Sequence, residues 1–377
     1  MSLEVRYAQL DDYPRLSAFL DTYWAKDHVY VRQRSLFDWT FGRRELWPYD
    51  GYSFALAEDH GEVVGILGGV PFVMNCFGCT SPGVWLANYM VRPDYRRGAL
   101  AVRLLNMFRQ PLFTVTIAFG VSTVAVSLYT ALRARVLETI PRHVAIFPDA
   151  VERATHLLRL AYPDWPAARA HALAQALRYQ QSLDDPGPYG TTIPANCDTQ
   201  DWSRWATCTV GAARDLAYLH WRYQSHPEFT YRIITVREGK CTGLAVWRLE
   251  TIHCATPRGR EPVDCIGRLV EFLPASYTNA EALLACFWQA LREANAIGAD
   301  YYGYHGGISA WLHGAGFHTV HDCTDGLAMP ARFQPLDGKG GRIVSAVFAP
   351  DDVLACAAEV QCPWYWTKSD ADQDRPN

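Results

Sequence analysis

The stretch from Met90 to Ala101 reads Met-Val-Arg-Pro-Asp-Tyr-Arg-Arg-Gly-Ala-Leu-Ala and holds the residues best suited to bind an anion. An apolar run from Val84 to Val91 leads into this stretch, and a helix-like run from Leu100 to Phe108 follows it. The order predicts a basic loop that joins a strand to a helix, where unpaired backbone N–H groups and the helix dipole favour negative charge. Arg96 and Arg97 would add charge-assisted donors, and the small residues between them and the helix would let a bulky pyrophosphate approach the backbone.

The spacing Arg96-x-x-Ala99-x-Ala101 resembles the pyrophosphate loop of the GNAT superfamily, the acyl-CoA N-acyltransferases. Ala99 departs from that pattern, because the family usually has Gly there. The resemblance implies acyl-CoA as co-substrate, direct attack of an amine on the thioester, and no metal. It implies that the donor is held by Met90, Val91, Arg92, Arg96, Arg97, Gly98, Ala99, Leu100 and Ala101.

Tyr129 is the expected general acid. The segment Ser127-Leu128-Tyr129-Thr130-Ala131-Leu132 resembles the Leu-Tyr-x-x-Leu segment of many GNAT enzymes, in which the tyrosine protonates the leaving thiolate. A phenol can do so because its ordinary pKa, near 10, keeps it protonated at neutral pH. Arg133 and Ala134 follow where the family usually has Gly-Phe, so the match is partial. A tyrosine packed in a helix is the structural alternative.

The general base is not evident from the sequence. Many GNAT relatives carry a carboxylate on the strand before the loop, but this strand has Asn88, which we expect to orient a substrate or a water. Glu271 and His305 are the candidate bases, since imidazole suits proton transfer near neutral pH. Asp38 and His220 are weaker candidates, and a structural role is the alternative for each of these residues.

The chain also echoes itself. An aromatic segment around Trp39 is followed by a strand, a tight Gly turn and a strand, and the same order follows Trp221. Because strands and helices alternate, we expect an α/β (α+β) fold. The resemblance to GNAT enzymes, together with the echo, implies two tandem GNAT-like domains, each a mixed, largely antiparallel central sheet flanked by helices. The expected parts are an acyl-CoA-binding domain at 1–150, a helical linker at 151–190, a degenerate GNAT-like domain at 191–335 and a C-terminal extension with a polar, disordered tail at 336–377. Pro274 to Asn279 stands where the first half has its basic loop, so only one acyl-CoA site is expected.

Composition limits the class of protein. The chain has 377 residues, 49% hydrophobic and 20% charged, as a folded two-domain protein would. Its formal net charge of −4 argues against nucleic acid as a partner. Eleven scattered cysteines and the absence of a signal peptide favour a cytoplasmic location with reduced thiols. Cys76 and Cys79 fit a hairpin turn better than a zinc site.

The segment from Pro111 to Leu132 carries no charged residue and has the length of a membrane span. Its Thr, Ser and Gly residues, and the β-branched alternation from Phe113 to Phe119, favour a buried strand instead. We therefore expect no stable membrane insertion.

The acceptor is suggested only by Trp221-Arg222-Tyr223, which looks similar to segments of bacterial nucleotide-sugar N-acyltransferases of polysaccharide biosynthesis. That resemblance implies a small-molecule amine, most favourably a nucleotide-linked amino sugar, with Arg222 on a phosphate and an aromatic ring stacked on the base or sugar. A core aromatic cluster is the structural alternative. The alternative functions are a non-catalytic acyl-CoA or nucleotide-binding protein, and a transferase acting on a peptide or amino-acid amine; a homodimer stays open.

Overall fold

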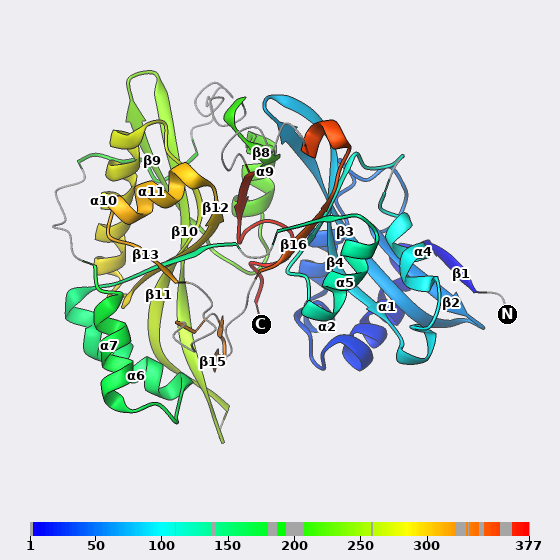
Figure 1. Cartoon of the computed structure of the whole chain (residues 1–377), viewed down its shortest axis with the longest axis horizontal. Coiled ribbons are helices and arrows are strands. Elements are labelled where there is room, and N and C mark those ends of the chain that lie inside the picture. Colours follow the sequence, from blue (N-terminus) through cyan, green and yellow to red (C-terminus); the bar gives the residue numbers. More distant parts are fainter. Residues whose placement is uncertain are drawn as a thin grey trace.

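The computed structural model describes residues 3–109, 111–137, 140–179, 187–193, 207–257, 259–320, 329–330, 332–338, 343–354 and 364–376. Two halves lie side by side, and the end of the chain runs between them (Figure 1). Each half is a mixed, mostly antiparallel sheet flanked by helices, which confirms the expected fold class. Within the described residues, no helix has both the length and the apolar character needed to cross a bilayer.

The sheet of the first half has the strand order β1-β2-β3-β4-β5-β16-β6. These strands span Glu4–Tyr7, Phe54–Asp59, Glu62–Cys76, Cys79–Val91, Val115–Phe119, Ser345–Phe348 and Arg135–Leu137. The β3–β4 hairpin turns at Phe77-Gly78, so Cys76 and Cys79 flank a tight turn, as expected. β5 confirms the strand expected in the uncharged segment.

Helices cover both faces of this first sheet. One face packs against α1 (Tyr13–Phe19), the π-helical turn η2 (Leu20–Trp24), α2 (Val29–Arg32) and α3 (Arg34–Phe41). The other face packs against α4 (Leu100–Asn106) and α5 (Thr123–Ala131). Leu100, Leu104 and Leu105 are buried at helical spacing on α4, so the apolar stripe of this helix is what docks it on the sheet.

The second half has the strand order β9-β10-β11-β12-β7-β13. Its strands span Arg232–Glu238, Cys241–Thr256, Gly259–Leu273, Gly298–Tyr304, Arg142–Ile146 and His318–Val320. Its helices are α9 (Leu216–Leu219), the π-helical turn η5 (His220–Gln224), α10 (Tyr277–Glu293) and α11 (Gly306–Gly314), with α6 (Val151–Ala161) and α7 (Ala167–Ala176) from the linker. A small hairpin of β14 (Arg332–Phe333) and β15 (Leu336–Asp337) forms a separate two-stranded sheet that packs against β10 and α6.

The halves exchange strands. β7 follows the first half along the chain but pairs with β12 and β13 of the second sheet. β16 follows the second half but pairs with β5 and β6 of the first. The expected boundaries at 150 and 336 are therefore corrected by the pairing, because 142–146 belongs to the second sheet and 345–348 to the first.

Trp39 and Trp221, the two residues that mark the echo in the sequence, stack on each other. Their ring centroids are 4.8 Å apart at an angle of 17°. Trp39 Nε1 donates to the carbonyl of Trp221 at 3.3 Å, and Trp221 Nε1 donates to the carbonyl of Trp39 at 3.4 Å. The contact is reciprocal, as it would be across a two-fold axis.

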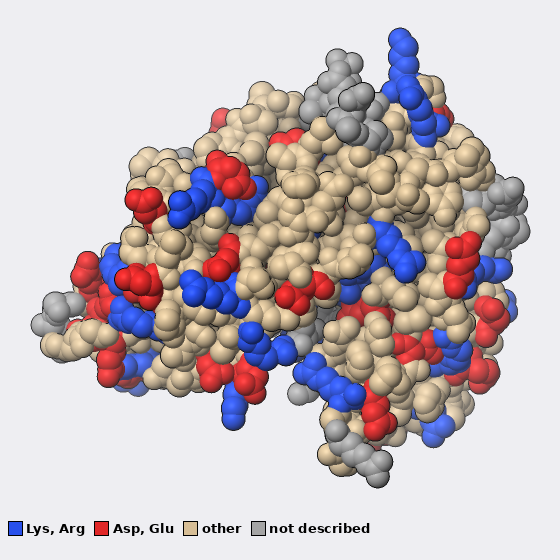
Figure 2. All heavy atoms as spheres, turned by 180° about the vertical axis from the view of Figure 1, so that it is seen from behind, with Lys and Arg blue, Asp and Glu red and all other residues tan. Residues whose placement is uncertain are grey.

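The C-terminal segment is buried, which corrects the expected disordered tail. β17 (Trp364–Thr367) pairs with β12 and with β8 (Val210–Ala212), and β8 pairs with β3, so that the sheets of the two halves join into one continuous sheet. Ser369, Asp370 and Asp374 are buried, each with at most 1% of its surface exposed. The outer surface carries charges of both signs intermixed over both halves on the face drawn in Figure 2.

Candidate functional site

The strands β4 and β5 part from each other at their carboxyl ends. Their parallel ladder ends at the pair Leu86–Ala118, although β4 continues to Val91. A register shift between β3 and β4 and a positive φ of 51° at Asn88 mark a bulge at this point. A bulge bends a strand and ends pairing locally. Beyond Leu86 the edge of β4 is therefore not paired with β5, and we call this gap in the ladder the opening between the two strands.

Asn88 is the polar group at the opening. Its side chain is 4% exposed, and neither Nδ2 nor Oδ1 has a hydrogen-bond partner among the described residues. Leaving a buried polar group unpaired costs about 1–3 kcal/mol. Such a group in a strand opening is suited to hydrogen-bond a ligand or a water, as the sequence predicted for Asn88.

The basic loop follows directly. Arg96 folds back on the end of β4, with Nε donating to the carbonyl of Val91 at 2.9 Å, and Arg97 and Gly98 are exposed. Arg92 is instead held by Asp94 at 2.7 Å and Glu62 at 3.0 Å. The Arg92 side chain is therefore neutralised by its own partners, and the expected role of Arg92 in holding the donor stays a prediction.

The start of α4 is uncapped. Ala99 occupies the N-cap position and has no side chain that could accept a hydrogen bond. The first N–H that bonds back into the helix is that of Arg103, to the carbonyl of Ala99 at 2.9 Å. The N–H groups ahead of it are those that a helix leaves unpaired. Leu100 is buried, while the Ala101 carbonyl accepts the Tyr89 hydroxyl at 2.5 Å.

Tyr129 lies on α5, the helix that follows β5. It is 3% exposed and packs near Phe348, with ring centroids 5.9 Å apart. It shares an apolar cluster with Leu100 and Leu104 of α4. Burial, and next the nearby Tyr89, raise the pKa of Tyr129 above its ordinary value, so its phenol stays protonated at neutral pH. A protonated phenol is the form that an acid requires.

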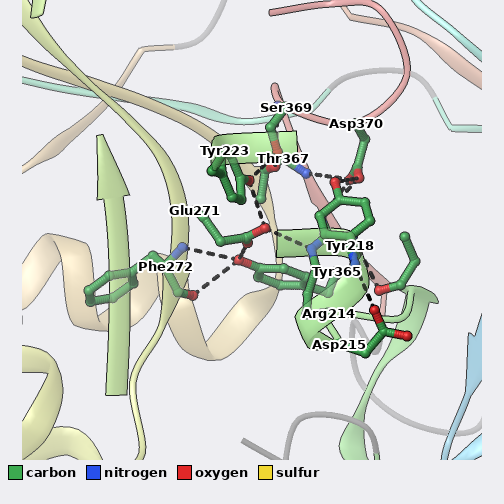
Figure 3. Close-up of polar contacts among 11 residues, drawn as sticks. Arg214, Asp215, Tyr218, Tyr223, Glu271, Phe272, Tyr365, Thr367, Ser369 and Asp370 are labelled. Carbon is green, nitrogen blue, oxygen red and sulfur yellow. Dashed lines mark hydrogen bonds and ion pairs between the residues drawn. The ribbon is translucent and has the colours of Figure 1, made fainter. Parts of the chain in front are cut away.

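Glu271 lies away from this loop, at the centre of a buried network (Figure 3). It is 0% exposed and accepts from Arg214 Nε at 2.7 Å and from the Tyr223 hydroxyl at 2.9 Å, while Tyr365 bonds its second oxygen. Burial raises the pKa of Glu271, although the Arg214 guanidinium opposes this shift. The candidate role as base is corrected, because both oxygens are occupied and no acceptor amine could reach them.

The Trp221-Arg222-Tyr223 segment is also interior, which corrects its expected role in substrate binding. Trp221 stacks on Trp39, and Arg222, 1% exposed, donates to the carbonyl of Asp374 at 3.1 Å. The structural alternative, a core aromatic cluster, therefore describes these residues. Tertiary packing hides them, and nothing local in the sequence could have shown this.

His305 follows β12 and is the N-cap residue of α11. Its ring centroid lies 6.3 Å from that of Tyr365. Burial lowers the pKa of His305, so the imidazole is neutral at pH 7. It stays a prediction as a base. The described residues hold no group of three or more His, Cys, Asp or Glu side chains that could bind a metal.

Residues 16–122 match the family described as the acetyltransferase (GNAT) family. The match includes the β4 bulge, the basic loop, α4 and β5. We refer to this matched part of the first half as the GNAT domain. The match supports an acyltransferase of the GNAT type, with acyl-CoA as the donor that the family uses. No curated protein matches the chain.

Solved structures share the whole fold of the chain at low identity. A GCN5-related N-acetyltransferase from Kribbella flavida has 12% identity and a TM-score of 0.55, over 93% of this chain and 72% of that one. The corresponding protein from Anabaena variabilis has 13% identity and a TM-score of 0.52, over 91% and 72%. Saccharomyces cerevisiae N-myristoyltransferase with bound myristoyl-CoA has 10% identity and a TM-score of 0.55, over 92% and 82%. At such identities the likeness concerns the fold.

Sequence reasoning missed the residues of the C-terminal segment. Gln373 donates from Nε2 to the carbonyl of Phe119, the last residue of β5, at 3.2 Å. The aromatic run Trp364-Tyr365-Trp366 was the one available signal, since three adjacent aromatic residues favour a buried strand. The GNAT domain is thus completed by a segment from the other end of the chain.

Proposed function

We propose that the chain transfers an acyl group from acyl-CoA to the amine of a small molecule, and that the single donor site lies in the GNAT domain. The observation that carries this proposal is the opening between β4 and β5, with the Asn88 amide, which has no partner among the described residues, in it and the exposed Arg96–Ala99 loop beside it. All of these residues fall inside the matched family segment.

In this proposal, Arg96, Arg97 and the backbone from Gly98 to Ala101 hold the diphosphate. Guanidinium groups and unpaired N–H groups are suited to phosphate oxygens. Asn88 hydrogen-bonds the thioester end of the donor or the acceptor. The acceptor amine attacks the thioester carbonyl carbon, so that a C–N bond forms and the C–S bond breaks. Tyr129 gives its proton to the leaving thiolate, and the amine proton passes to a water or a base.

The acceptor side is bounded by η2, which lies against β4. Tyr23 and Trp24 at the end of this π-helical turn are each 37% exposed. π-Helical turns are often found at functional sites, and exposed aromatic rings can stack on a planar or sugar-like group. These residues replace Trp221 and Tyr223 as the proposed acceptor contacts. A nucleotide-linked amino sugar remains the acceptor that we propose to test first.

We also infer that the two halves are tandem copies. The reciprocal Trp39–Trp221 contact and the reciprocal strand exchange support this inference. In the first copy, the helix after the loop, α4, has no side chain at its N-cap that could accept a hydrogen bond. In the second, Ser276 Oγ accepts from Asn279 N at 3.1 Å, and Asn279 Oδ1 accepts from Ala275 N at 3.0 Å. These side chains occupy the N–H groups that a diphosphate would need.

The proposal is tested by thiol release from acyl-CoA. Purified protein would be given acetyl-CoA, and in parallel a longer acyl-CoA such as myristoyl-CoA, with a panel of amines that includes amino-sugar nucleotides, free amino sugars, amino acids and short peptides. Amine-dependent release of CoA with formation of the amide is the expected result. Saturable CoA binding with no release for any amine would favour a binding protein over an enzyme.

A further inference from the structure

The second half has the same kind of strand opening as the GNAT domain. β11 and β12 are parallel, and their ladder ends at the pair Leu269–Tyr301. β11 continues to Leu273, and a register shift between Val246 and Trp247 of β10 marks a bulge near the end of the ladder. Glu271 stands two residues beyond the last pair, as Asn88 stands two residues beyond Leu86 on β4. Asn88 is unpaired, whereas Glu271 is fully bonded.

The difference is that the chain itself fills the second opening. β17 pairs with the end of β12 at Thr367–Gly303 and Trp366–Tyr304. Successive residues of a strand turn their N–H and C=O groups to opposite edges. Gly303 N–H bonds to Pro141 on the β7 edge, so the Tyr302 carbonyl, which accepts from Lys368 N at 3.1 Å, faces the β11 edge. β17 therefore takes the place next to β12 that β11 leaves.

The same strand also contacts β11. The Tyr365 hydroxyl meets the Phe272 N–H at 3.2 Å and the Phe272 carbonyl at 3.1 Å, besides its bond to Glu271 (Figure 3). The hydroxyl accepts from the Phe272 N–H, and its single hydrogen is shared between the Glu271 carboxylate and the Phe272 carbonyl. A side chain of the C-terminal segment thus stands where a bound ligand would hydrogen-bond.

Buried charges hold the segment in this place. Arg214 binds Asp370 at 2.9 Å, and Arg248 binds Asp374 at 2.7 Å. The Tyr231 hydroxyl donates to the same Asp374 carboxylate at 2.7 Å. Removing one partner of a buried ion pair leaves the other charge uncompensated and is strongly destabilising. The segment is therefore a fixed part of the second half.

From there the segment reaches the opening of the GNAT domain. Gly120 N–H bonds to Val344 O, next to β16, so the preceding carbonyl, that of Phe119, faces the β4 edge. Gln373 Nε2 donates to this carbonyl at 3.2 Å. Gly120 has φ of +77°, and a Cβ there would come within 2.8 Å of the Gln373 side chain. Gln373 therefore contacts the turn that leads from β5 into α5 and restrains it. α5 is the helix that carries Tyr129.

We propose that residues 364–376 act as a built-in ligand of the second half and that Gln373, at the far end of this segment, is a positioning residue of the acyl-transfer site. The segment excludes acyl-CoA from the second opening and fixes the β5–α5 turn of the first. That this site performs acyl transfer rests on the proposed function. The contact of Gln373 with the β5–α5 turn does not depend on that function.

The test uses the full chain with Gln373→Glu, which keeps the size of the side chain but turns a carboxylate oxygen toward the Phe119 carbonyl. Gln373→Met, which is uncharged and equally long, serves if the first variant does not fold. Gln289→Glu, on the exposed face of α10, is the matched control. Hydrogen–deuterium exchange is measured on peptides covering 115–131 and 266–273. Thiol release from acetyl-CoA and calorimetric binding of CoA are measured in parallel.

We expect exchange in 120–131 to accelerate about tenfold in the Gln373 variants, while 266–273 and the control stay unchanged. Turnover of acetyl-CoA should fall about tenfold, with the Kd of CoA changed by less than about twofold, because a mispositioned turn affects the reacting end of the site rather than diphosphate binding. Exchange and turnover equal to those of Gln289→Glu would overturn the role of Gln373. Failure of the wild-type protein to bind CoA would overturn the proposed function instead. Hydrogen–deuterium exchange in 120–131 would still show whether Gln373 restrains the turn.

Discussion

Tyr129 and Arg96 could be proposed from the sequence because each lies in a short local pattern. Burial of Tyr129 could not be read from that pattern, and it raises the pKa of a phenol that is already protonated at neutral pH. Glu271, Trp221 and Arg222 show the opposite outcome. Their residue types suggested chemistry, but long-range partners such as Arg214 and Asp374 place them in the interior.

Replacing Tyr129 by Phe tests the acid at this scale. We expect kcat to fall about 10²-fold with CoA affinity unchanged, because the ring still packs and only the proton donor is lost. Because the pKa is raised, wild-type turnover should not lose this acid at the ordinary tyrosine pKa of about 10. Tyr52→Phe, which removes a hydroxyl bonded to Asp38, is the control. Full turnover in Tyr129→Phe would show that another donor serves.

Lys368 gives a prediction about stability. Desolvation, and next the neighbouring Arg268, lower the pKa of Lys368 to about 7. Folding therefore removes a proton that the unfolded lysine keeps up to its ordinary pKa, and stability should rise with pH between about 7 and 10.5, by no more than about 1.4 kcal/mol per unit. Urea unfolding of wild type and Lys368→Met at several pH values measures this. Equal pH slopes for both proteins would contradict the assignment.

The order of elements could be predicted, since apolar period and turn residues determine it locally. The strand at 115–119, the helix from Leu100 and the strand ending at Leu273 all match their expected places. The burial of the C-terminal segment could not be predicted, because three aspartates are expected at the surface unless their arginine partners are known. The strand exchange was also hidden, since β7 and β16 are short and pair with partners far away along the chain.

At the same scale, the helices that follow β4 and β11 differ at their N-termini. Ser276 caps α10, whereas α4 has Ala99 at this position. Ser276→Ala should destabilise the protein by about 1 kcal/mol, because α10 loses its N-cap acceptor. CoA affinity should not change, since the first half binds the donor. Chemical unfolding and calorimetry measure the two effects, and Ser276→Thr, which keeps a capping hydroxyl, is the control. A loss of CoA affinity in Ser276→Ala would place the donor in the second half.

At the largest scale, the two halves form one folded unit. A single apolar cluster runs through both halves, and each sheet is completed by a strand from the other half of the chain. The pair Trp39–Trp221 lies where the halves meet. The sequence echo pointed to this pair, but only the structure shows that the two residues contact each other.

A double-mutant cycle on Trp39→Leu and Trp221→Leu measures that contact. We expect a coupling free energy of about 1 kcal/mol, because stacked aromatic rings that also exchange hydrogen bonds stabilise each other beyond their separate burial. Additive effects of the two substitutions would mean that the stacking contributes nothing to the interface between the halves.

The most direct test of a single donor site in the GNAT domain is calorimetric titration with CoA of the wild type and of the variant that carries Arg96→Ala and Arg97→Ala. Arg103→Ala, on the exposed side of the same helix, is the control. One equivalent should bind to the wild type and to the control, and affinity should fall at least about tenfold in the double variant, since two charge-assisted phosphate contacts are lost. Two equivalents, or an affinity unchanged in the double variant, would contradict the assignment of the donor to this loop.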